Sequence, residues 1–187
     1  MGEKEEKLSS FPLYYSNLNN GGKRMLKKLF KKKDTQESLI SPITGTIVQL
    51  EDVPDEVFSQ KMLGDGIAIE PTEGVVVAPI SGEVVQFFPT KHAIGIQAKS
   101  GLEVLIHIGM DTVELNGEGF QGHVQQGDTV SAGDQLVTFD LEFVREKAKS
   151  IITPVVITNF DIVETLTKTG DKTVTRGNST LLAVKLK

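Results

Sequence analysis

The chain has 187 residues, 39% of them hydrophobic and 24% charged, which suits a globular domain with a sizeable core and excludes a mainly disordered chain. It contains no cysteine, which excludes disulfides, thiolate catalysis and cysteine-ligated metals, and no apolar run approaches the length of a bilayer span. The net charge of −5 is uneven: residues 23–33 hold seven Lys or Arg, which leaves 13 basic against 25 acidic residues elsewhere. An acidic body argues against nucleic-acid binding and suits a basic protein partner.

Residues 1–38 are expected to form a flexible N-terminal extension, because the alternating pattern of strands begins only near Leu39. The apolar residues of its basic stretch 23–33 share one side of a helix, namely Met25, Leu26, Leu29 and Phe30. This stretch is interpreted either as an amphipathic segment in weak contact with a membrane surface or as a solvated tail. A further hypothesis is that Met25 is the natural start and residues 1–24 are translated leader, because Gly-Gly-Lys-Arg before it can be encoded by a purine-rich string that resembles a ribosome-binding site.

Residues 39–187 are predicted to form an all-β domain. Short runs rich in Val, Ile and Thr are separated by Gly, Asp and Pro, as in "GIAIEP", "GEVVQFF", "AIGIQA" and "EVLIHIG". This spacing is typical of an antiparallel β-sandwich or a barrel-like domain. One or two short helices are expected within it, the clearer one over residues 141–150, with Asp140 as its cap and Pro154 beyond its end.

An internal repeat lies within this domain. "SPITGTIVQL" at 41–50 recurs as "APISGEVVQF" at 78–87, each with Pro-Ile, then Ser or Thr, then Gly before a β-branched pair. The glycine is expected to supply a tight turn and the apolar residues the strand behind it. Two related hairpin-like units packed together would make one β domain.

Motifs typical of other protein classes are either absent from the sequence or lie in an unsuitable predicted structure. "GEGFQG" at 117–122 has dinucleotide-binding spacing, but the residues after it predict strand and turn rather than a helix, so its glycines are interpreted as loop geometry. No phosphate-binding G-x-x-x-x-G-K-[ST] and no G-x-S-x-G elbow occur, and the three histidines include no H-x-H or H-x-x-x-H pair for zinc. A biotin or lipoate carrier is a less favoured alternative, resting on the Lys61-Met62 pair in "FSQKMLGDG".

His107 lies in the apolar strand "GLEVLIHIGM" at 101–110. By alternation its side chain shares a face with Leu105, Gly109 and Asp111. The other residues are expected to point into the core, namely Val104, Ile106, Ile108 and Met110. A polar ring on a half-buried strand needs either a local hydrogen-bond partner or a chemical role, and both interpretations are open at this point.

The other two histidines have weaker contexts. His92 begins another strand in "PTKHAIGIQA" and is interpreted, by itself, as a strand-edge residue. His123 lies in a polar loop and is expected to be solvated.

The stretches "GLEVLIHIGMDTVELNGEGF", "TKHAIGI" and "SPITGTIVQLEDVPDEVFSQKMLGDGIAIEP" resemble the glucose-type enzyme IIA component of the phosphoenolpyruvate-dependent sugar phosphotransferase system. The resemblance runs from about Ile40 to the C-terminus and implies an antiparallel β-sandwich. It implies that His107 accepts a phosphoryl group from the phosphocarrier protein HPr. The group then passes to a cysteine in the IIB domain of a sugar permease.

The resemblance also assigns supporting residues. It implies that His92 stabilises the phosphate, that Thr90 lies beside His92, and that the backbone of Gly109 lies against the phosphorylated histidine. Asp111 and Val113 would line the site. No cofactor or metal is required, because the donor is already an activated phosphohistidine and neutral imidazole is a good nucleophile near its ordinary pKa of about 6.5.

A regulatory binding module is the alternative from a different functional class. The resemblance allows the unphosphorylated protein to inhibit permeases or metabolic enzymes, with zinc bridging His92 and His107 in such a complex.

Because the chain contains no cysteine, the acceptor of the phosphoryl group must lie on a separate polypeptide. The expected location is the cytoplasm, with contact at the inner face of the membrane through residues 23–33.

Overall fold

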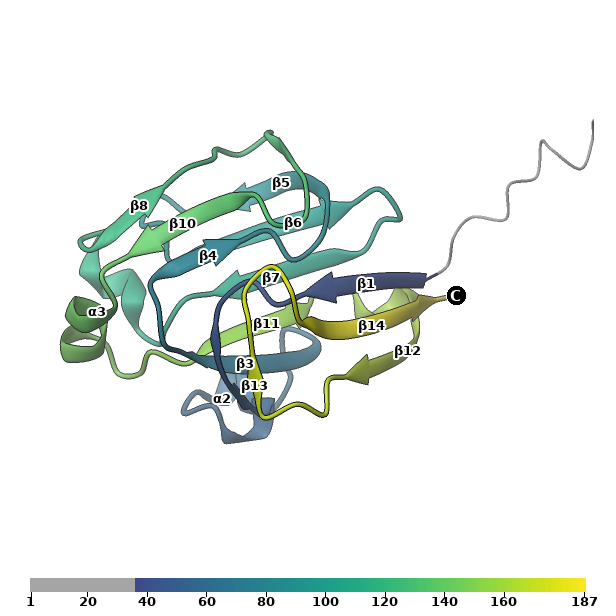
Figure 1. Ribbon diagram of the computed structural model, residues 1–187, viewed down its shortest axis with the longest axis horizontal. Coiled ribbons are helices and arrows are strands. Elements are labelled where there is room, and N and C mark those ends of the chain that lie inside the picture. The colour runs from purple at the N-terminus through teal and green to yellow at the C-terminus, as the bar shows by residue number, and fades with distance from the viewer. Residues whose placement is uncertain (1–35) are drawn as a thin grey trace, which may run out of the picture. The chain divides into compact units, whose positions relative to one another are not determined.

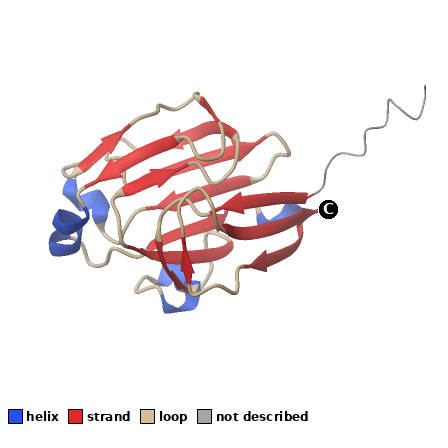
Figure 2. Ribbon diagram, in the orientation of Figure 1, coloured by secondary structure: helices blue, strands red, loops and turns tan. Residues whose placement is uncertain are grey.

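The computed structural model describes residues 36–187 (Figure 1). The predictions about Met25, the leader and the basic stretch 23–33 lie outside the described residues. Within them the chain forms antiparallel strands with only short helices, as expected (Figure 2). The first strand begins at Gln36, slightly before the alternating pattern at Leu39. No helix in this part of the chain is long and apolar enough to cross a membrane.

The strands form one large sheet and two small ones. The eight-stranded sheet has the order β13 (Thr173–Val174), β2 (Gly45–Val48), β3 (Asp65–Pro71), β11 (Thr153–Ile157), β7 (Glu103–His107), β6 (Ala93–Ala98), β5 (Gly82–Phe87) and β9 (Thr129–Val130). One small sheet has the order β1 (Gln36–Ile40), β14 (Thr180–Leu186) and β12 (Val163–Lys168). The other has the order β4 (Val75–Val77), β10 (Gln135–Phe139) and β8 (Phe120–Gly122).

The main core lies between the large sheet and the two small ones. Ile94 and Ile106 from the large sheet share one buried cluster with Leu136 of β10 and Leu182 of β14. A second cluster joins the 3-10 helix η2 (Leu50–Asp52) and helix α2 (Glu56–Ser59) to β3 and β11, and its buried members are Leu50, Val53, Phe58, Ala68, Met110 and Val156. Both faces of the central strands are therefore covered by apolar side chains, although the second cluster is smaller than the main core.

The internal repeat appears in the structure as a pair of reciprocal hydrogen bonds. The N–H of Ile40 donates to the carbonyl of Pro79 at 2.9 Å, and the N–H of Val77 donates to the carbonyl of Pro42 at 2.9 Å. Each donor stands two residues before the proline of its own repeat. The two Pro-Ile motifs therefore bind each other symmetrically, which confirms two related units in one domain.

The symmetry extends to a second pair of segments, which was not recognised as a repeat in the sequence. "TVSAGD" at 129–134 pairs with β5 through β9, and "TVTRGN" at 173–178 pairs with β2 through β13. The N–H of Gly133 donates to the carbonyl of Ala78, and the N–H of Gly177 donates to that of Ser41. Only three of the six letters agree, so the relation was too weak to detect without the strand pairing.

The repeated glycine has a different role from the one expected. Gly45 and Gly82 are the first residues of β2 and β5, and neither has a left-handed φ. A Cβ added to Gly45 would lie 2.1 Å from the carbonyl oxygen of Glu70, and one added to Gly82 would lie 2.3 Å from the carbonyl oxygen of Gln97. The prediction of a tight turn was therefore wrong, and close approach of the neighbouring strand is what requires glycine here.

Gly45→Ala is expected to lower the free energy of unfolding by about 1–3 kcal/mol, because β3 must move away from β2. Urea unfolding would measure the change. The matched control is Gly170→Ala, since Gly170 lies in open space without a left-handed φ, and its effect should stay within about 0.5 kcal/mol. Equal stabilities of the Gly45 variant and the wild type would contradict the close-approach explanation.

Helix α3 (Leu141–Lys147) begins where the sequence predicts, and the side chain of Asp140 caps it by accepting from the N–H of Phe143 at 3.0 Å. It ends before Ser150, because the Ser150 carbonyl accepts from Met110 in an isolated β-bridge that requires extended backbone. No helix follows "GEGFQG": Gly117 and Gly119 have left-handed φ values in a turn, and strand β8 comes next.

Candidate functional site

The pairing of β6 with β7 brings His92 and His107 together. Ala93 of β6 lies opposite His107 at the end of β7, and the N–H of Ile108 donates to the carbonyl of His92 at 2.7 Å. The two imidazole rings have centroids 4.9 Å apart and are nearly perpendicular, at 77°. Two residues fifteen positions apart in the chain thus form one site at the end of the two strands.

The tautomer of His107 is fixed by its backbone partner. Its Nδ1 lies 2.8 Å from the carbonyl oxygen of Gly109, which can only accept, so Nδ1 carries the proton and Nε2 keeps its lone pair in the neutral ring. Gly109 has φ +70°, which turns its carbonyl back toward the ring. An added Cβ there would lie 2.6 Å from Cγ2 of Thr112 and 2.9 Å from the carbonyl oxygen of Ser150, so the position requires glycine.

His92 is held by a hydroxyl and an aromatic ring. Its Nδ1 lies 2.6 Å from Oγ1 of Thr90, and the ring of Phe88 stands 5.2 Å away between centroids. The residue is only 4% exposed. With Nδ1 bound to Thr90, its Nε2 is the ring nitrogen free to meet a ligand.

Both imidazoles are neutral at pH 7. Burial lowers the pKa of His92 to about 4, with a smaller contribution from neighbouring His107. Burial also lowers the pKa of His107, although its bond to Gly109 and the carboxylates of Asp55 and Asp111 act in the opposite direction. Neutral His107 therefore presents an unprotonated Nε2, as a nucleophile must.

The depressed pKa of His92 predicts a pH dependence of stability. Because the pKa is about 4 in the folded chain and 6.5 ordinarily, the unfolded chain binds more protons between these values. The free energy of unfolding is therefore unaffected by protonation of His92 above pH 6.5. It decreases as the pH falls from 6.5 to 4, by on the order of 3 kcal/mol in all.

Urea unfolding at a series of pH values would check this expectation. His92→Gln, which does not titrate, should have a correspondingly flatter profile between pH 4 and 6.5. Parallel profiles for wild type and variant would show that His92 is not held neutral by burial.

The strand alternation predicted around His107 holds only as far as Ile108. Val104, Ile106 and Ile108 enter the main core as expected. Met110 does not join them: it packs in the second cluster, on the same side as Leu105. The prediction for Met110 was wrong because β7 ends at His107 and the left-handed backbone of Gly109 breaks the alternation.

The remaining predicted residues lie along the chain that leaves β7. Asp111 is exposed, has φ +60° and precedes the 3-10 helix η3 (Thr112–Leu115). Val113 in this helix is 51% exposed. His123 is exposed and binds Oγ1 of Thr138 at 2.9 Å.

Three residues near the histidines were missed from the sequence. The ring of Phe58 in α2 meets that of His107 edge to face, with centroids 5.2 Å apart, and Phe88 lies beside His92. Asp55 caps α2 by accepting from the N–H groups of Val57 and Phe58. The Asp-x-x-Phe spacing is a signal for the capped turn, but nothing in the sequence links residue 58 to residue 107.

The capacity of the site for metal is limited. His92 and His107 offer two imidazoles, but no group of three or more His, Cys, Asp or Glu residues within 36–187 is placed to hold an ion. A structural or catalytic zinc site usually has at least three protein ligands. Zinc shared with a partner protein remains a prediction.

Comparisons with known proteins identify the family of this chain. Residues 37–163 match the model of the family described as "phosphoenolpyruvate-dependent sugar phosphotransferase system, EIIA 1". The glucose-specific EIIA component of Bacillus anthracis is 54% identical over 165 residues, covering 87% of this chain and 100% of the relative. That of Halalkalibacterium halodurans is 52% identical over 171 residues, covering 87% and 99%.

A solved structure supports the same assignment. The glucose permease IIA of Mycoplasma capricolum superposes with a TM-score of 0.73 at 43% identity, covering 80% of this chain and 96% of that one. Its fold is the IIA β-sandwich, so the expected fold class is confirmed. The match of family model, full-length relatives and structure leads to one conclusion: this chain belongs to the EIIA family of the phosphoenolpyruvate-dependent sugar phosphotransferase system, and is a phosphotransferase component.

Proposed function

We propose that the protein is a phosphoryl carrier, which accepts a phosphoryl group from phospho-HPr on Nε2 of His107 and donates it to the cysteine of a IIB domain. The observation that carries the proposal is the bond from Nδ1–H of His107 to Gly109. It leaves Nε2 as the free lone pair of a neutral ring beside a second imidazole.

In the first step Nε2 of His107 attacks the phosphorus of phospho-HPr in line. The new N–P bond forms as the N–P bond of the donor breaks, and the donor nitrogen keeps that electron pair. The ring of His107 gains positive charge, which the Gly109 carbonyl and the carboxylates of Asp55 and Asp111 stabilise. In the second step a thiolate of the IIB domain attacks phosphorus, and the electron pair returns to Nε2.

His92 stabilises the phosphoryl group on His107, above all during its transfer to the IIB domain. If Oγ1–H of Thr90 donates to Nδ1 of His92, then Nε2 of that ring carries a proton and donates to a phosphoryl oxygen. The aromatic rings of Phe58 and Phe88 border the two imidazoles and reduce access of water to the N–P bond.

The partners follow from charge and composition. Outside residues 23–33 the chain has 25 acidic against 13 basic residues, which favours association with a basic carrier such as HPr. The 187 residues contain no cysteine, so the acceptor thiol lies outside them. We place this exchange in the cytoplasm, and contact of residues 23–33 with the membrane remains a prediction.

The test is phosphorylation with Enzyme I, HPr and ³²P-labelled phosphoenolpyruvate. We expect label that is acid-labile and base-stable, with the phosphorus on Nε2 of His107 by NMR. Omitting HPr should abolish it. Absence of label while HPr itself is labelled, or label on another residue, would overturn the proposal.

A further inference from the structure

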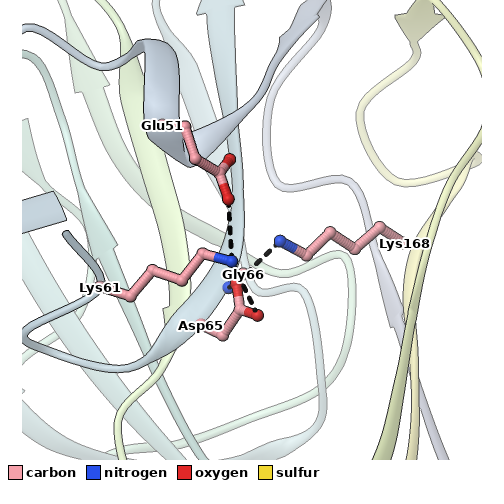
Figure 3. A network of polar contacts seen from close by, with 5 residues as sticks. All are labelled: Glu51, Lys61, Asp65, Gly66 and Lys168. Carbon is pink, nitrogen blue, oxygen red and sulfur yellow. Dashed lines mark hydrogen bonds and ion pairs between the residues drawn. The ribbon is translucent and has the colours of Figure 1, made fainter. Parts of the chain in front are cut away.

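Four charged residues from four segments form a network next to α2 (Figure 3). Nζ of Lys61 lies 2.8 Å from Oε1 of Glu51 and 3.3 Å from Oδ2 of Asp65. Nζ of Lys168 lies 2.7 Å from Oδ1 of Asp65 and approaches it from the side opposite Lys61 in Figure 3. The network therefore joins η2, the turn after α2, the start of β3 and the end of β12.

The backbone of Lys61 shows that this turn is held by its surroundings. Lys61 has φ +57°, a left-handed conformation that is unfavourable for a residue with a Cβ and persists where neighbouring contacts enforce it. It follows α2, which has four residues and is too short to be stable alone. The two ion pairs of its side chain supply contacts at the point where the chain reverses from α2 into β3.

The segment closed by the Glu51–Lys61 ion pair carries Phe58, whose ring stands 5.2 Å from that of His107. The N–H of Lys61 also donates to the carbonyl of Phe58 at 2.9 Å. Asp65 attaches the same lysine to β3, a strand of the sheet that contains His107. Lys61 thus connects the backbone of Phe58 to the large sheet, in addition to the direct contact between the rings of Phe58 and His107.

We infer that Lys61, with Glu51 and Asp65, is a positioning residue for phosphoryl transfer: it holds the segment between η2 and β3 so that Phe58 stands against His107 before the partner arrives. This inference rests on the proposed function. In a chain without the network, that segment must be ordered when phospho-HPr binds, and the cost of ordering weakens binding without altering the bound site.

Lys61→Met is the variant to examine, because removal of the ammonium leaves no buried charge unpaired. Asp65 keeps its bond to Lys168, and the carboxylate of Glu51 is 54% exposed and becomes hydrated. We expect the KM for phospho-HPr to rise about fivefold, equivalent to about 1 kcal/mol, with kcat unchanged. Lys61→Arg, which can reach the same carboxylates, should restore the KM.

An NMR measurement tests the positioning without any partner. The ring current of Phe58 acts on the ring protons of His107, so their chemical shifts should change in Lys61→Met and return in Lys61→Arg. Glu51→Gln removes the shorter ion pair of Lys61 at an exposed site and should produce a smaller change in the same direction. The matched control is Lys185→Met, which breaks a 2.7 Å ion pair with Glu164 on the sheet of β12 and β14.

The outcomes separate this inference from the proposed function. Unchanged His107 shifts together with an unchanged KM in Lys61→Met would overturn the positioning role, as would equal changes in Lys185→Met. A wild type that HPr does not phosphorylate would overturn the proposed function instead, and the chemical shifts would still decide whether Lys61 positions Phe58.

Discussion

His107→Ala is expected to abolish phosphorylation by phospho-HPr. Its Nε2 is the nitrogen whose lone pair is fixed by the bond from Nδ1–H to Gly109, and no nearby group replaces it. His92 is the only other imidazole at the site, and in the tautomer that we propose its Nε2 carries the proton, so this nitrogen has no lone pair to attack phosphorus. The measurement is incorporation of label from ³²P-phosphoenolpyruvate in the presence of Enzyme I and HPr.

The variant should remain folded, which makes the loss interpretable. His107 is half-buried, and the substitution removes one hydrogen bond to a carbonyl, at a cost of about 1 kcal/mol. Circular dichroism and urea unfolding would verify this. His123→Ala is the matched control, because His123 is an exposed histidine that binds a surface threonine, and it should be labelled like the wild type. Label retained in His107→Ala would show that His107 is not the residue that accepts the phosphoryl group.

His92→Gln is expected to separate acceptance from donation. The glutamine keeps a polar group of similar reach near Thr90 but lacks the imidazole N–H that we assign to the phosphoryl oxygens. The variant should still accept phosphate from phospho-HPr. Onward transfer to a IIB domain should slow on the order of 10²-fold, the usual consequence of losing one donor to a developing charge.

A single-turnover experiment would measure this step. The phosphorylated variant is isolated, mixed with a IIB domain, and sampled for loss of label from one protein and gain by the other. His123→Gln controls for the chemistry of the substitution. Transfer from the His92 variant at the wild-type rate would mean that His92 has a structural role only.

Local features of the fold could be predicted because they depend on neighbouring residues. The cap at Asp140, the start of α3 and the loop character of Gly117 and Gly119 follow from backbone preferences within a few positions. Predictions failed where contacts from distant segments decide the conformation. Gly45 was interpreted as a turn residue, but the carbonyl of Glu70 on the next strand is what excludes a side chain.

The candidate site likewise combines features that neighbouring residues predict with features that distant segments determine. His107 could be singled out as a polar ring on an apolar strand, but its alternation pattern misplaced Met110, because a left-handed glycine changes the direction of the chain after the strand. Phe58 was not identified, because it reaches His107 through the packing of α2 on the large sheet.

The amino-acid sequence was enough to identify the all-β class, the internal repeat, the absence of cysteine and, through the motif around His107, the family. These depend on composition, periodicity and short-range pattern. Three further properties could be recognised only in the folded protein: the 4.9 Å approach of the two imidazoles, the proton on Nδ1 of His107 and the network around Lys61. Strand register, burial and through-space electrostatics set these properties, and each involves residues that are remote along the chain.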